Sequence, residues 1–369
     1  MNRVGIVGGG QLGMMLAEAG ARIGIECLTL DPAPDSPASR VAPSLVAPYD
    51  DEAALAELAS VSDVVTYEFE NVPVASARFL AERVAVFPPP ESLEFAQDRL
   101  LEKTLFEEVG LAVAPFAPVS STEDLGEAMD LVGFPSILKT RRLGYDGKGQ
   151  VRLERPDQTG DAWREVGEVP SILEALVPFD RELSILAARG RDGDAVFYPL
   201  VENVHRDGIL RTSMPASSAT LALQSKAEEL ALAVMERLGH VGVLAIELFE
   251  TGEGLVGNEM APRVHNSGHW TIEGAVTSQF ENHLRAVSGM GLGAATRTAY
   301  SAMVNLVGSE PPDEAFPADP GVHVHRYGKH ARPGRKLGHV TIVEKDTDTL
   351  FQVLQEVTRT ADKELRWPT

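Results

Sequence analysis

The sequence predicts a protein of mixed α/β and α+β class with two or three domains. Its 369 residues are enough for that number of domains, each with its own core. Near the start, residues 4–30 follow the pattern of a parallel strand–helix–strand unit. Further on, residues 241–260 follow the pattern of a long antiparallel hairpin. Three consecutive prolines, at positions 88–90, separate the two regions and mark a domain boundary.

The first region contains a glycine turn, Gly8-Gly9-Gly10-Gln11-Leu12-Gly13, between an apolar strand and a helix expected over residues 14–23. Glycines let backbone N–H groups approach an anionic ligand at a helix N-terminus. The second strand, residues 27–30, ends at Asp31, and this spacing matches the dinucleotide-binding fingerprint of an NAD-dependent oxidoreductase. Asp31 precedes Pro32-Ala33-Pro34, so its alternative role is to form a turn.

Acidic residues follow the next strand expected in this region. A helix over residues 51–59 leads to a strand over residues 61–69, and Glu68-Phe69-Glu70 stands at its end. Open α/β sheets bind ligands at the carboxyl ends of their strands, so these acids are candidate ligand contacts. The alternative is an acidic loop exposed to solvent. Beyond the prolines, residues 92–109 are amphipathic and predict a helix.

A glycine-rich loop lies between two further expected strands. Residues 134–139 predict a strand that ends in Lys139, and residues 151–153 predict the next one. Glycines at positions 144, 147 and 149 allow the loop to lie over phosphates, with Lys139 as a point charge beneath them. The alternative is an ordinary hairpin turn with solvated lysines. A strand over residues 171–177 and the linker after it could offer backbone groups to an adenine, with Glu182 near a ribose hydroxyl.

Two glutamates are expected to face each other in the hairpin. Glu247 lies in the apolar strand 241–249, on the face opposite to that of Leu244 and Ile246. A turn centred on Glu253 places Glu247, six residues before it, directly opposite Glu259, six residues after it. If the register differs by one residue, one of the two glutamates is solvated instead.

Opposed carboxylates need a partner of opposite charge. Their Cβ atoms lie about 5 Å apart, and the two negative charges repel. Mg²⁺ is typically held by one or two carboxylates together with substrate phosphates, as in phosphoryl-transfer enzymes. Arg263, His265 and Asn266 follow closely after Glu259, and this concentration of polar groups favours a functional site.

Composition restricts the partners that the chain can have. A net charge of −21 and a pI of about 4.8 argue against nucleic acid and against anionic membranes. An anionic substrate would need a local basic pocket, and residues 323–336 contain five cationic residues and no acid. The single cysteine, Cys27, fits a reducing compartment. With no bilayer-spanning apolar run and no signal-peptide layout at the start, we expect a cytoplasmic protein.

Together these motifs resemble those of ATP-grasp ligases. The resemblance rests on Lys139, the loop 144–150, Arg181-Glu182-Leu183-Ser184, His205-Arg206-Asp207-Gly208-Ile209-Leu210-Arg211, Glu247 and the run 258–270. More narrowly, the chain resembles the 5-(carboxyamino)imidazole ribonucleotide synthases of purine biosynthesis, with which the glycine turn and Arg332-Pro333-Gly334-Arg335-Lys336 also agree. The resemblance extends from residue 3 to about residue 343, and segments 144–150 and 258–270 are its specific parts.

The resemblance implies an ATP-grasp fold in three domains. An N-terminal Rossmann-like (preATP-grasp) domain is expected over residues 1–95, and the ATP-grasp domain over residues 96–295, with a lid subdomain at about 115–178. A small β-rich C-terminal domain is expected over residues 296–369. The resemblance also implies a homodimer.

The resemblance assigns roles to particular residues, with ATP, Mg²⁺, bicarbonate and aminoimidazole ribonucleotide as the ligands. Contacts to ATP are expected from Arg99, Lys139, Gly144, Tyr145, Asp146, Gly147, Lys148, Gly149, Gln150, Glu174, Ala175, Leu176, Val177, Glu182, His205, Asn258 and Glu259. The residues expected to bind magnesium are Glu247 and Glu259. Those expected at the nucleotide substrate are Gly10, Gln11, Leu12, Glu70, Lys329, Arg335 and Lys336, which displaces the dinucleotide interpretation of the glycine turn. Those expected to be catalytic are Asp146, Lys148, Arg263, His265 and Asn266.

The implied reaction has two steps. ATP phosphorylates bicarbonate to give carboxyphosphate and ADP, and the exocyclic amine of the imidazole then attacks the activated carbonyl, or the CO₂ released from it. Our hypothesis is that Arg263 and Lys148 orient bicarbonate, while either Asp146 or His265 positions or deprotonates the amine. The chain departs from the pattern of many ATP-grasp enzymes at Ala261, where they carry Asn. It also has Lys148 where some relatives have Arg, so a bidentate anion contact is lost there.

Three other interpretations are open. An NAD-dependent oxidoreductase leaves the Glu247–Glu259 pair unexplained. A non-catalytic nucleotide-binding protein would be expected to lose Lys139 or a magnesium carboxylate, and all three are present. A related ligase that uses another acceptor is opposed by the residues at 263–270.

Overall fold

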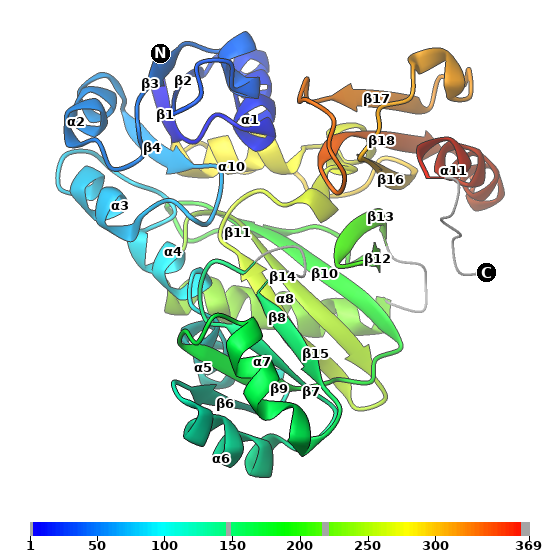
Figure 1. The fold of residues 1–369 in the computed structure, drawn as a ribbon. Helices are drawn as coiled ribbons and strands as arrows, with labels where there is room; N and C mark the ends of the chain where they lie inside the picture. Colours follow the sequence, from blue (N-terminus) through cyan, green and yellow to red (C-terminus); the bar gives the residue numbers. More distant parts are fainter. Residues whose placement is uncertain (1–2, 145–148, 216–220, 363–369) are drawn as a thin grey trace.

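The computed structural model of the chain describes residues 3–144, 149–215 and 221–362, which form three β-sheets (Figure 1). The largest sheet lies in the middle of the molecule. A small antiparallel sheet lies below its middle part in Figure 1, and the N-terminal sheet lies at the upper left. The last strands of the chain form one end of the largest sheet and lie at the upper right. The N-terminal sheet is parallel and the other two sheets are mainly antiparallel, which confirms the predicted mixture of α/β and α+β structure.

The N-terminal sheet is parallel, with the strand order β3-β2-β1-β4. Its strands are β1 (Arg3–Val7), β2 (Glu26–Asp31), β3 (Ser44–Val46) and β4 (Val64–Tyr67); its helices are α1 (Gln11–Arg22), η1 (Pro37–Arg40), α2 (Glu52–Val61) and α3 (Val74–Ala81). Helix α1 begins directly after the glycine turn, with Gly10 as its N-cap. The turn therefore lies at the carboxyl end of β1, as the sequence pattern predicts.

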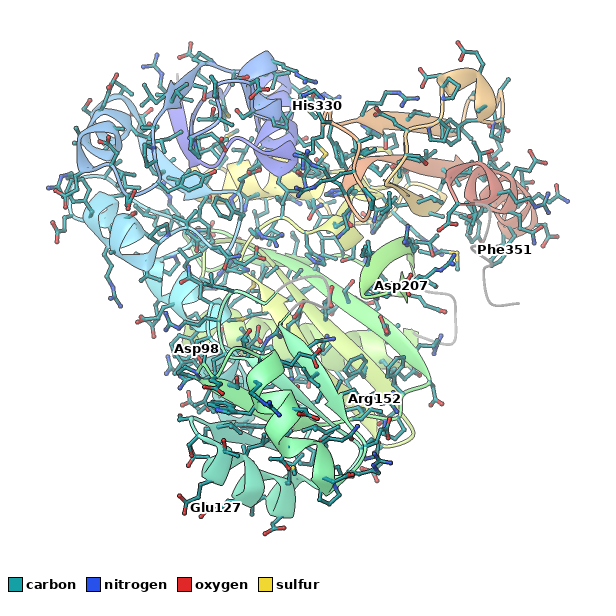
Figure 2. The ribbon with its side chains drawn as sticks, in the orientation of Figure 1. Asp98, Glu127, Arg152, Asp207, His330 and Phe351 are labelled. Carbon is teal, nitrogen blue, oxygen red and sulfur yellow. The ribbon has the colours of Figure 1, made fainter. Side chains whose placement is uncertain are left out.

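The helix expected over residues 92–109 is two helices, α4 (Pro90–Ala96) and α5 (Arg99–Glu108). Asp98 divides them, because its carboxylate accepts from the N–H of Leu100 and starts a new helix. The same carboxylate binds Arg141 at 2.8 Å and Arg142 at 3.1 Å. Asp98 thus ties the start of α5 to the loop that follows Lys139, and Figure 2 shows it beside the lower part of the molecule.

A small sheet with the order β6-β9-β7-β8 makes the lower part of the molecule, and we call it the lid sheet. Its elements are β6 (Phe116–Val119), α6 (Thr122–Val132), β7 (Ser136–Thr140), β8 (Gln150–Leu153), η2 (Pro156–Gln158), α7 (Thr159–Glu165) and β9 (Ser171–Ala175). Glu127 of α6 and Arg152 of β8 mark this part in Figure 2. Its core includes Leu138 and Trp163. The short strand just before β6, β5 (Ala112–Val113), pairs with the central sheet instead of the lid sheet.

The central sheet runs in the order β17-β18-β16-β13-β12-β10-β14-β15-β5, and β11 also pairs with β10. Its remaining strands are β10 (Arg181–Arg189), β11 (Ala195–Phe197), β12 (Val201–Arg206), β13 (Ile209–Pro215), β14 (Gly242–Thr251), β15 (Gly254–Ala261), β16 (Tyr300–Val307), β17 (Val322–Arg326) and β18 (Lys336–Glu344). The helices beside it are α8 (Leu221–Arg237), η3 (Asn266–Gly268), α9 (Thr271–Gly274), α10 (Gln279–Val287), η4 (Asp313–Ala315) and α11 (Thr347–Ala361). One core cluster joins Leu244 and Ile246 of β14 to Val234 and Met235 of α8, so the other face of β14 is left for Glu247.

The hairpin of β14 and β15 places Glu247 directly opposite Glu259, as predicted. The predicted turn is wrong, however. Only Gly252 and Glu253 separate the strands, because Thr251 already pairs with Gly254. Counted outward from the turn, this register holds up to the pair of Leu248 and Gly257, and the next pair would be Glu247 with Asn258. An irregularity between Glu247 and Leu248 leaves Asn258 as an extra residue, so that Glu247 pairs with Glu259. The opposition of the two glutamates is therefore made by a β-bulge.

The loop between β17 and β18 joins the C-terminal strands to the N-terminal sheet. Lys329 in this loop binds the side chain of Gln11, and the Arg40 side chain donates to the carbonyl of Gly328 at 2.6 Å. Figure 2 shows His330 of the same loop in the space between the two parts. No helix in the described ranges has both the length and the apolar character needed to cross a membrane.

Candidate active site

A cavity of about 670 Å³ lies where the lid sheet, the central sheet, the N-terminal sheet and the C-terminal strands meet. It brings together sixteen of the predicted site residues: Gln11, Leu12, Glu70, Arg99, Lys139, Gly144, Gln150, Glu182, His205, Glu247, Asn258, Glu259, Arg263, His265, Asn266 and Lys336. Outside its lining are Gly10, Gly149, Glu174, Ala175, Leu176, Val177, Lys329 and Arg335. Predicted Tyr145, Asp146, Gly147 and Lys148 lie outside the described residues.

The two opposed glutamates lie in this cavity, and each is contacted by a basic side chain. Arg99 Nη1 lies 3.2 Å from Glu259 Oε2, and His265 Nε2 lies 3.5 Å from Glu247 Oε1. Burial, together with the charge of Glu259, raises the pKa of Glu247 to about 7. Burial also opposes ionisation of Glu259, but the charges of Arg99 and Lys139 outweigh it and lower its pKa. The two carboxylates therefore interact strongly.

This carboxylate pair fits the coordination preference of magnesium. It offers hard oxygen donors from two strands, and Mg²⁺ is bound in proteins by one or two carboxylates that leave room for phosphate oxygens. Among the residues that the structure describes, no group of three or more His, Cys, Asp or Glu side chains is arranged to hold a metal ion. Phosphate oxygens of a nucleotide and water are suitable further ligands for such a pair.

Lys139 belongs to a buried ionic cluster on the lid side of the cavity. Its ammonium lies 3.0 Å from Glu174 Oε2, and Lys103 lies 3.3 Å from the same oxygen. Burial disfavours the charged form of Glu174, but the two lysines outweigh it and lower the pKa of Glu174 to about 2. The Glu174 side chain therefore lies between Lys139 and Lys103. Lys103 is not among the residues predicted from the sequence.

The first two backbone N–H groups after Glu174 already form hydrogen bonds to other backbone carbonyls. The N–H of Ala175 donates to the carbonyl of Pro115 at 2.8 Å, and that of Leu176 donates to Pro135 at 3.0 Å. Next along the chain, Phe179 stacks on Phe249, with ring centroids 4.7 Å apart. Phe249 also lines the cavity. The linker thus supplies an apolar surface beside the cavity.

His205 and Glu182 form a contact on the neighbouring strands β12 and β10. Burial alone would lower the pKa of His205, but the bond to Glu182 and the charge of Glu247 raise it. Both side chains line the cavity. Their carboxylate and imidazole can bind the hydroxyl groups of a sugar.

The segment after β15 supplies the three predicted groups at the inner end of the cavity. Arg263 forms an ion pair with Glu70 from the end of β4. Burial, with the nearby charge of Arg263, lowers the pKa of His265 well below its usual value, so this imidazole is neutral at pH 7. The amide of Asn266 makes reciprocal hydrogen bonds with Asn305, at 3.0 and 2.7 Å.

The glycine turn is organised by two buried acids. Asp31 accepts from the N–H of Gly9 and of Ala33, both at 2.8 Å, so it stabilises a turn and does not face a ribose. Glu68 accepts from Gly10 and Gly13, both at 2.6 Å. The N–H of Gly10 therefore already has an acceptor in Glu68. The N–H groups of Gln11 and Leu12 belong to the first turn of α1, where no intrahelical acceptor exists.

The C-terminal basic segment approaches this glycine turn. Lys329 binds the Gln11 side chain, and Lys336 lines the cavity. Burial lowers the pKa of Lys329 to about 8. Arg335 donates to the carbonyl of His330 at 3.2 Å, within the same loop. The acidic chain therefore does contain a local basic surface where an anionic substrate needs one.

These features define the class of the protein. A lid sheet with a buried lysine, a second sheet with paired carboxylates and a cavity between them are the parts of an ATP-grasp enzyme. Comparison with family models agrees. Residues 104–280 match the ATP-grasp domain, residues 1–97 match the ribonucleotide synthetase preATP-grasp domain, and residues 301–352 match the phosphoribosylaminoimidazole carboxylase C-terminal domain.

Individual relatives narrow the class further. The chain is 49% identical, over 355 residues, to N5-carboxyaminoimidazole ribonucleotide synthase of Pseudomonas aeruginosa. The aligned residues cover 96% of this chain and 98% of the relative. The crystal structure of the corresponding synthetase from Thermus thermophilus has a TM-score of 0.95 and 51% identity, and covers 99% of this chain and 100% of the other. The Aspergillus clavatus enzyme, solved with ADP and 5-aminoimidazole ribonucleotide, has a TM-score of 0.91 and 29% identity, with 98% and 99% covered.

The chain belongs to the N5-carboxyaminoimidazole ribonucleotide synthase family. It is an ATP-grasp ligase, with the preATP-grasp and C-terminal domains that the resemblance implies.

Proposed function

We propose that this chain carboxylates 5-aminoimidazole ribonucleotide with bicarbonate, at the expense of ATP, in purine biosynthesis. The products are 5-carboxyaminoimidazole ribonucleotide, ADP and phosphate. The observation that carries the proposal is a single cavity that joins the lysine and carboxylate pair of a phosphoryl-transfer site to the glycine turn and the basic C-terminal segment. A phosphoryl-transfer site and a basic site for a nucleotide substrate are what this reaction requires.

ATP is proposed to lie between the lid sheet and the central sheet. Lys139, Arg99 and the loop 144–150 contact its phosphates, Glu182 and His205 bind its ribose, and the backbone of residues 174–177 lies along its adenine. Asn258 and Glu259 complete this end of the site. Closure of the lid over ATP would keep water from the reactive intermediate.

Glu247 and Glu259 are proposed to hold magnesium against the phosphates of ATP. When bound there, magnesium neutralises the negative charge that the γ-phosphoryl group carries during transfer to bicarbonate. The carboxylates act as ligands, and the Arg99 guanidinium, 3.2 Å from Glu259, orients that carboxylate. Lys139 contributes a positive charge near the transferred group.

Arg263, His265 and Asn266 are proposed to act on bicarbonate and on the imidazole amine. The Arg263 guanidinium binds bicarbonate, and Lys148 assists it. After carboxyphosphate has formed, the amine attacks its carbonyl carbon or the CO₂ released from it. The bond from carbon to the phosphate oxygen breaks, phosphate leaves, and the amine loses a proton. His265, whose imidazole is neutral before this step, is one candidate to position the amine or to take that proton. Asp146 remains the other candidate for this role.

The nucleotide substrate is proposed to bind across the junction of the N-terminal and C-terminal parts. Its phosphate contacts the N–H groups of Gln11 and Leu12 together with Lys329, while Lys336 and Arg335 add positive charge. Gly10 shapes this turn. Glu70, whose carboxylate holds Arg263, is proposed at the ribose, so this residue would link the two substrates.

Three further proposals rest on resemblance and composition. We propose domain boundaries near residues 95 and 295, with a lid subdomain at about 115–178 and a C-terminal domain from residue 296. We propose that the chain forms a homodimer. We also propose a cytoplasmic location and small molecules as its substrates, which fit its acidic composition and its single cysteine.

The test is ADP release by the purified protein with ATP, magnesium and bicarbonate, with and without 5-aminoimidazole ribonucleotide. Strong stimulation by the ribonucleotide is expected, and loss of it in a Glu259→Gln protein. Glu253→Gln, at the exposed turn of the same hairpin, is the control. A protein that binds ATP but shows no stimulation would require another acceptor, and other amines and ribonucleotides would be screened next.

A further inference from the structure

One face of helix α5 binds the strand that carries Glu259. Arg99, Glu102 and Lys103 lie three and four residues apart, so their side chains leave the helix on one side. All three contact β15. Arg99 binds the Glu259 carboxylate itself, whereas Glu102 and Lys103 bind the backbone on either side of it. Arg99 is a proposed ATP contact, whereas Glu102 lines the same cavity and Lys103 contacts Glu174 without a proposed contact to either substrate.

Lys103 binds the bulge itself. Its ammonium donates to the carbonyl of Gly257 at 3.1 Å and to that of Asn258 at 2.8 Å. The side chain is 1% exposed, so these bonds are not shared with solvent. Gly257 is the last residue of β15 that pairs with β14 in the register set by the turn, and Asn258 is the extra residue of the β-bulge. The two carbonyls thus belong to the residue next to the β-bulge and to its inserted residue.

Glu102 binds the backbone on the other side of Glu259. Its Oε1 accepts from the N–H of Met260 at 2.6 Å, and the residue is 2% exposed. Gly257 also approaches α5 so closely that a Cβ there would lie 2.9 Å from Phe106 of that helix. The segment from Gly257 to Met260 is therefore attached to α5 before, at and after Glu259.

We propose that Lys103 and Glu102 are positioning residues that hold the β15 bulge and thereby set Glu259 opposite Glu247. This inference rests on the proposed metal role of the two glutamates. Without the bulge, the register of the hairpin turn places Asn258 opposite Glu247. Since a bulge leaves ladder groups unpaired, an external partner is needed to hold it, and the buried ammonium supplies one. The α5 clamp, defined as Glu102 and Lys103, therefore acts on the metal site through the backbone.

A different role for Lys103 makes a different prediction. Lys103 also lies 3.3 Å from Glu174, the partner of Lys139. If it only balanced the charge of Glu174, its removal would change the binding of phosphates with or without magnesium. If it holds the bulge, its removal weakens the part of the binding that magnesium adds.

The experiment compares ADP affinity with and without Mg²⁺ by calorimetry, in the wild-type protein and in Lys103→Met. The factor by which Mg²⁺ strengthens ADP binding is expected to fall about 10- to 100-fold in Lys103→Met, as for other groups that orient metal ligands. The affinity without Mg²⁺ should change little. Lys226→Met, on the exposed side of α8, is the matched control and should keep the full factor.

A second measurement needs neither metal nor nucleotide. Amide hydrogen exchange in the ligand-free protein should be faster over residues 254–261 in Lys103→Met than in the wild type or in Lys226→Met. Lys103→Gln is made in parallel, and the same expectations apply to it if the methionine variant does not fold.

Glu259→Gln separates failure of this inference from failure of the proposed function. If Glu259→Gln loses the magnesium factor while Lys103→Met keeps it with unchanged exchange, the inference is overturned and the metal site stands. If Glu259→Gln keeps the factor, the metal site fails and the inference fails with it. In the double variant, the loss should equal that of Glu259→Gln alone, because Lys103 acts through that residue.

Discussion

Lys329 offers a test of the proposed phosphate site, because its charge changes within the pH range of an ordinary assay. It lies in the loop between β17 and β18 and binds the side chain of Gln11, at the start of α1. Burial lowers its pKa from 10.5 to about 8, with repulsion from Arg335 and Lys336 acting in the same direction and attraction to Glu68 acting against it. The ammonium is therefore charged at neutral pH and largely neutral above pH 9.

The size of the effect follows from this pKa. With a pKa of about 8, roughly 90% of the side chain is protonated at pH 7 and about 9% at pH 9. If only the ammonium form binds the substrate phosphate, the KM for 5-aminoimidazole ribonucleotide rises with pH, by about tenfold between pH 7 and pH 9. A hydrogen bond between charged groups contributes about 1.5–3 kcal/mol, so Lys329→Met should raise this KM at pH 7 by roughly 10- to 150-fold.

The assay is steady-state ADP release at several pH values between 7 and 9, with ATP, magnesium and bicarbonate saturating. A phosphate monoester has its second pKa near about 6, so the substrate keeps its charge over this range. Lys329→Arg keeps a permanent positive charge and should lack the tenfold rise between pH 7 and pH 9. Lys345→Met, an exposed lysine just after β18, should behave as the wild type.

Two outcomes would refute the reasoning. The first combines two results: the wild-type KM does not rise between pH 7 and pH 9, and Lys329→Met has a KM close to that of the wild type. Binding of the substrate phosphate would then not depend on this ammonium. The second is an equal rise in the wild type and in Lys329→Arg, because another group would then be titrating. In either case the phosphate would have to be placed elsewhere on the basic segment.

Three further predictions concern buried positions. Trp270 is fully buried, so Trp270→Ala should destabilise the protein by roughly 3–5 kcal/mol in chemical unfolding, and a change near zero would contradict its place in the core. Burial raises the thiol pKa of Cys27 to about 12, so a disulfide reagent should modify it only after denaturation; rapid reaction of the native protein would show that the site opens. In Gly13→Ala, the new Cβ would lie 2.8 Å from the Gly8 carbonyl oxygen, which displaces the turn. The KM for the nucleotide substrate should rise while ADP affinity is unchanged, and an unchanged KM would remove the turn from the substrate site.

Local patterns predict the parts of the site that depend on periodicity. The alternation in β14 separates Glu247 from the apolar face, because side chains of a strand point to opposite sides. The glycine turn and Lys139 are also found at the ends of the expected strands, since each is marked by a change of composition along the chain. The structure adds the contacts between distant segments that bring these groups into one cavity.

The buried charges could not be predicted in the same way. Glu68, Glu102 and Lys103 are among the residue types that normally face solvent, so their identity alone favours an exposed position. Each is buried because backbone groups of another segment, or in the case of Lys103 also a carboxylate, satisfy it. A local pattern does not contain those partners, which are 55 to 158 residues away in the contacts of Glu68 and Glu102.

The hairpin shows how a correct prediction can rest on an incomplete reason. The prediction of opposed glutamates assumes a turn centred on Glu253, but the turn is shorter by one residue and the inserted Asn258 compensates for it. Since a regular two-residue hairpin would pair Glu247 with Asn258, the local sequence alone does not specify the carboxylate pair. The buried side chains of α5 contact the strand at the places where the register changes, so the geometry of the proposed metal site depends on a helix that precedes it by about 150 residues. Substitutions on that helix should therefore affect magnesium binding even though they do not alter either ligand.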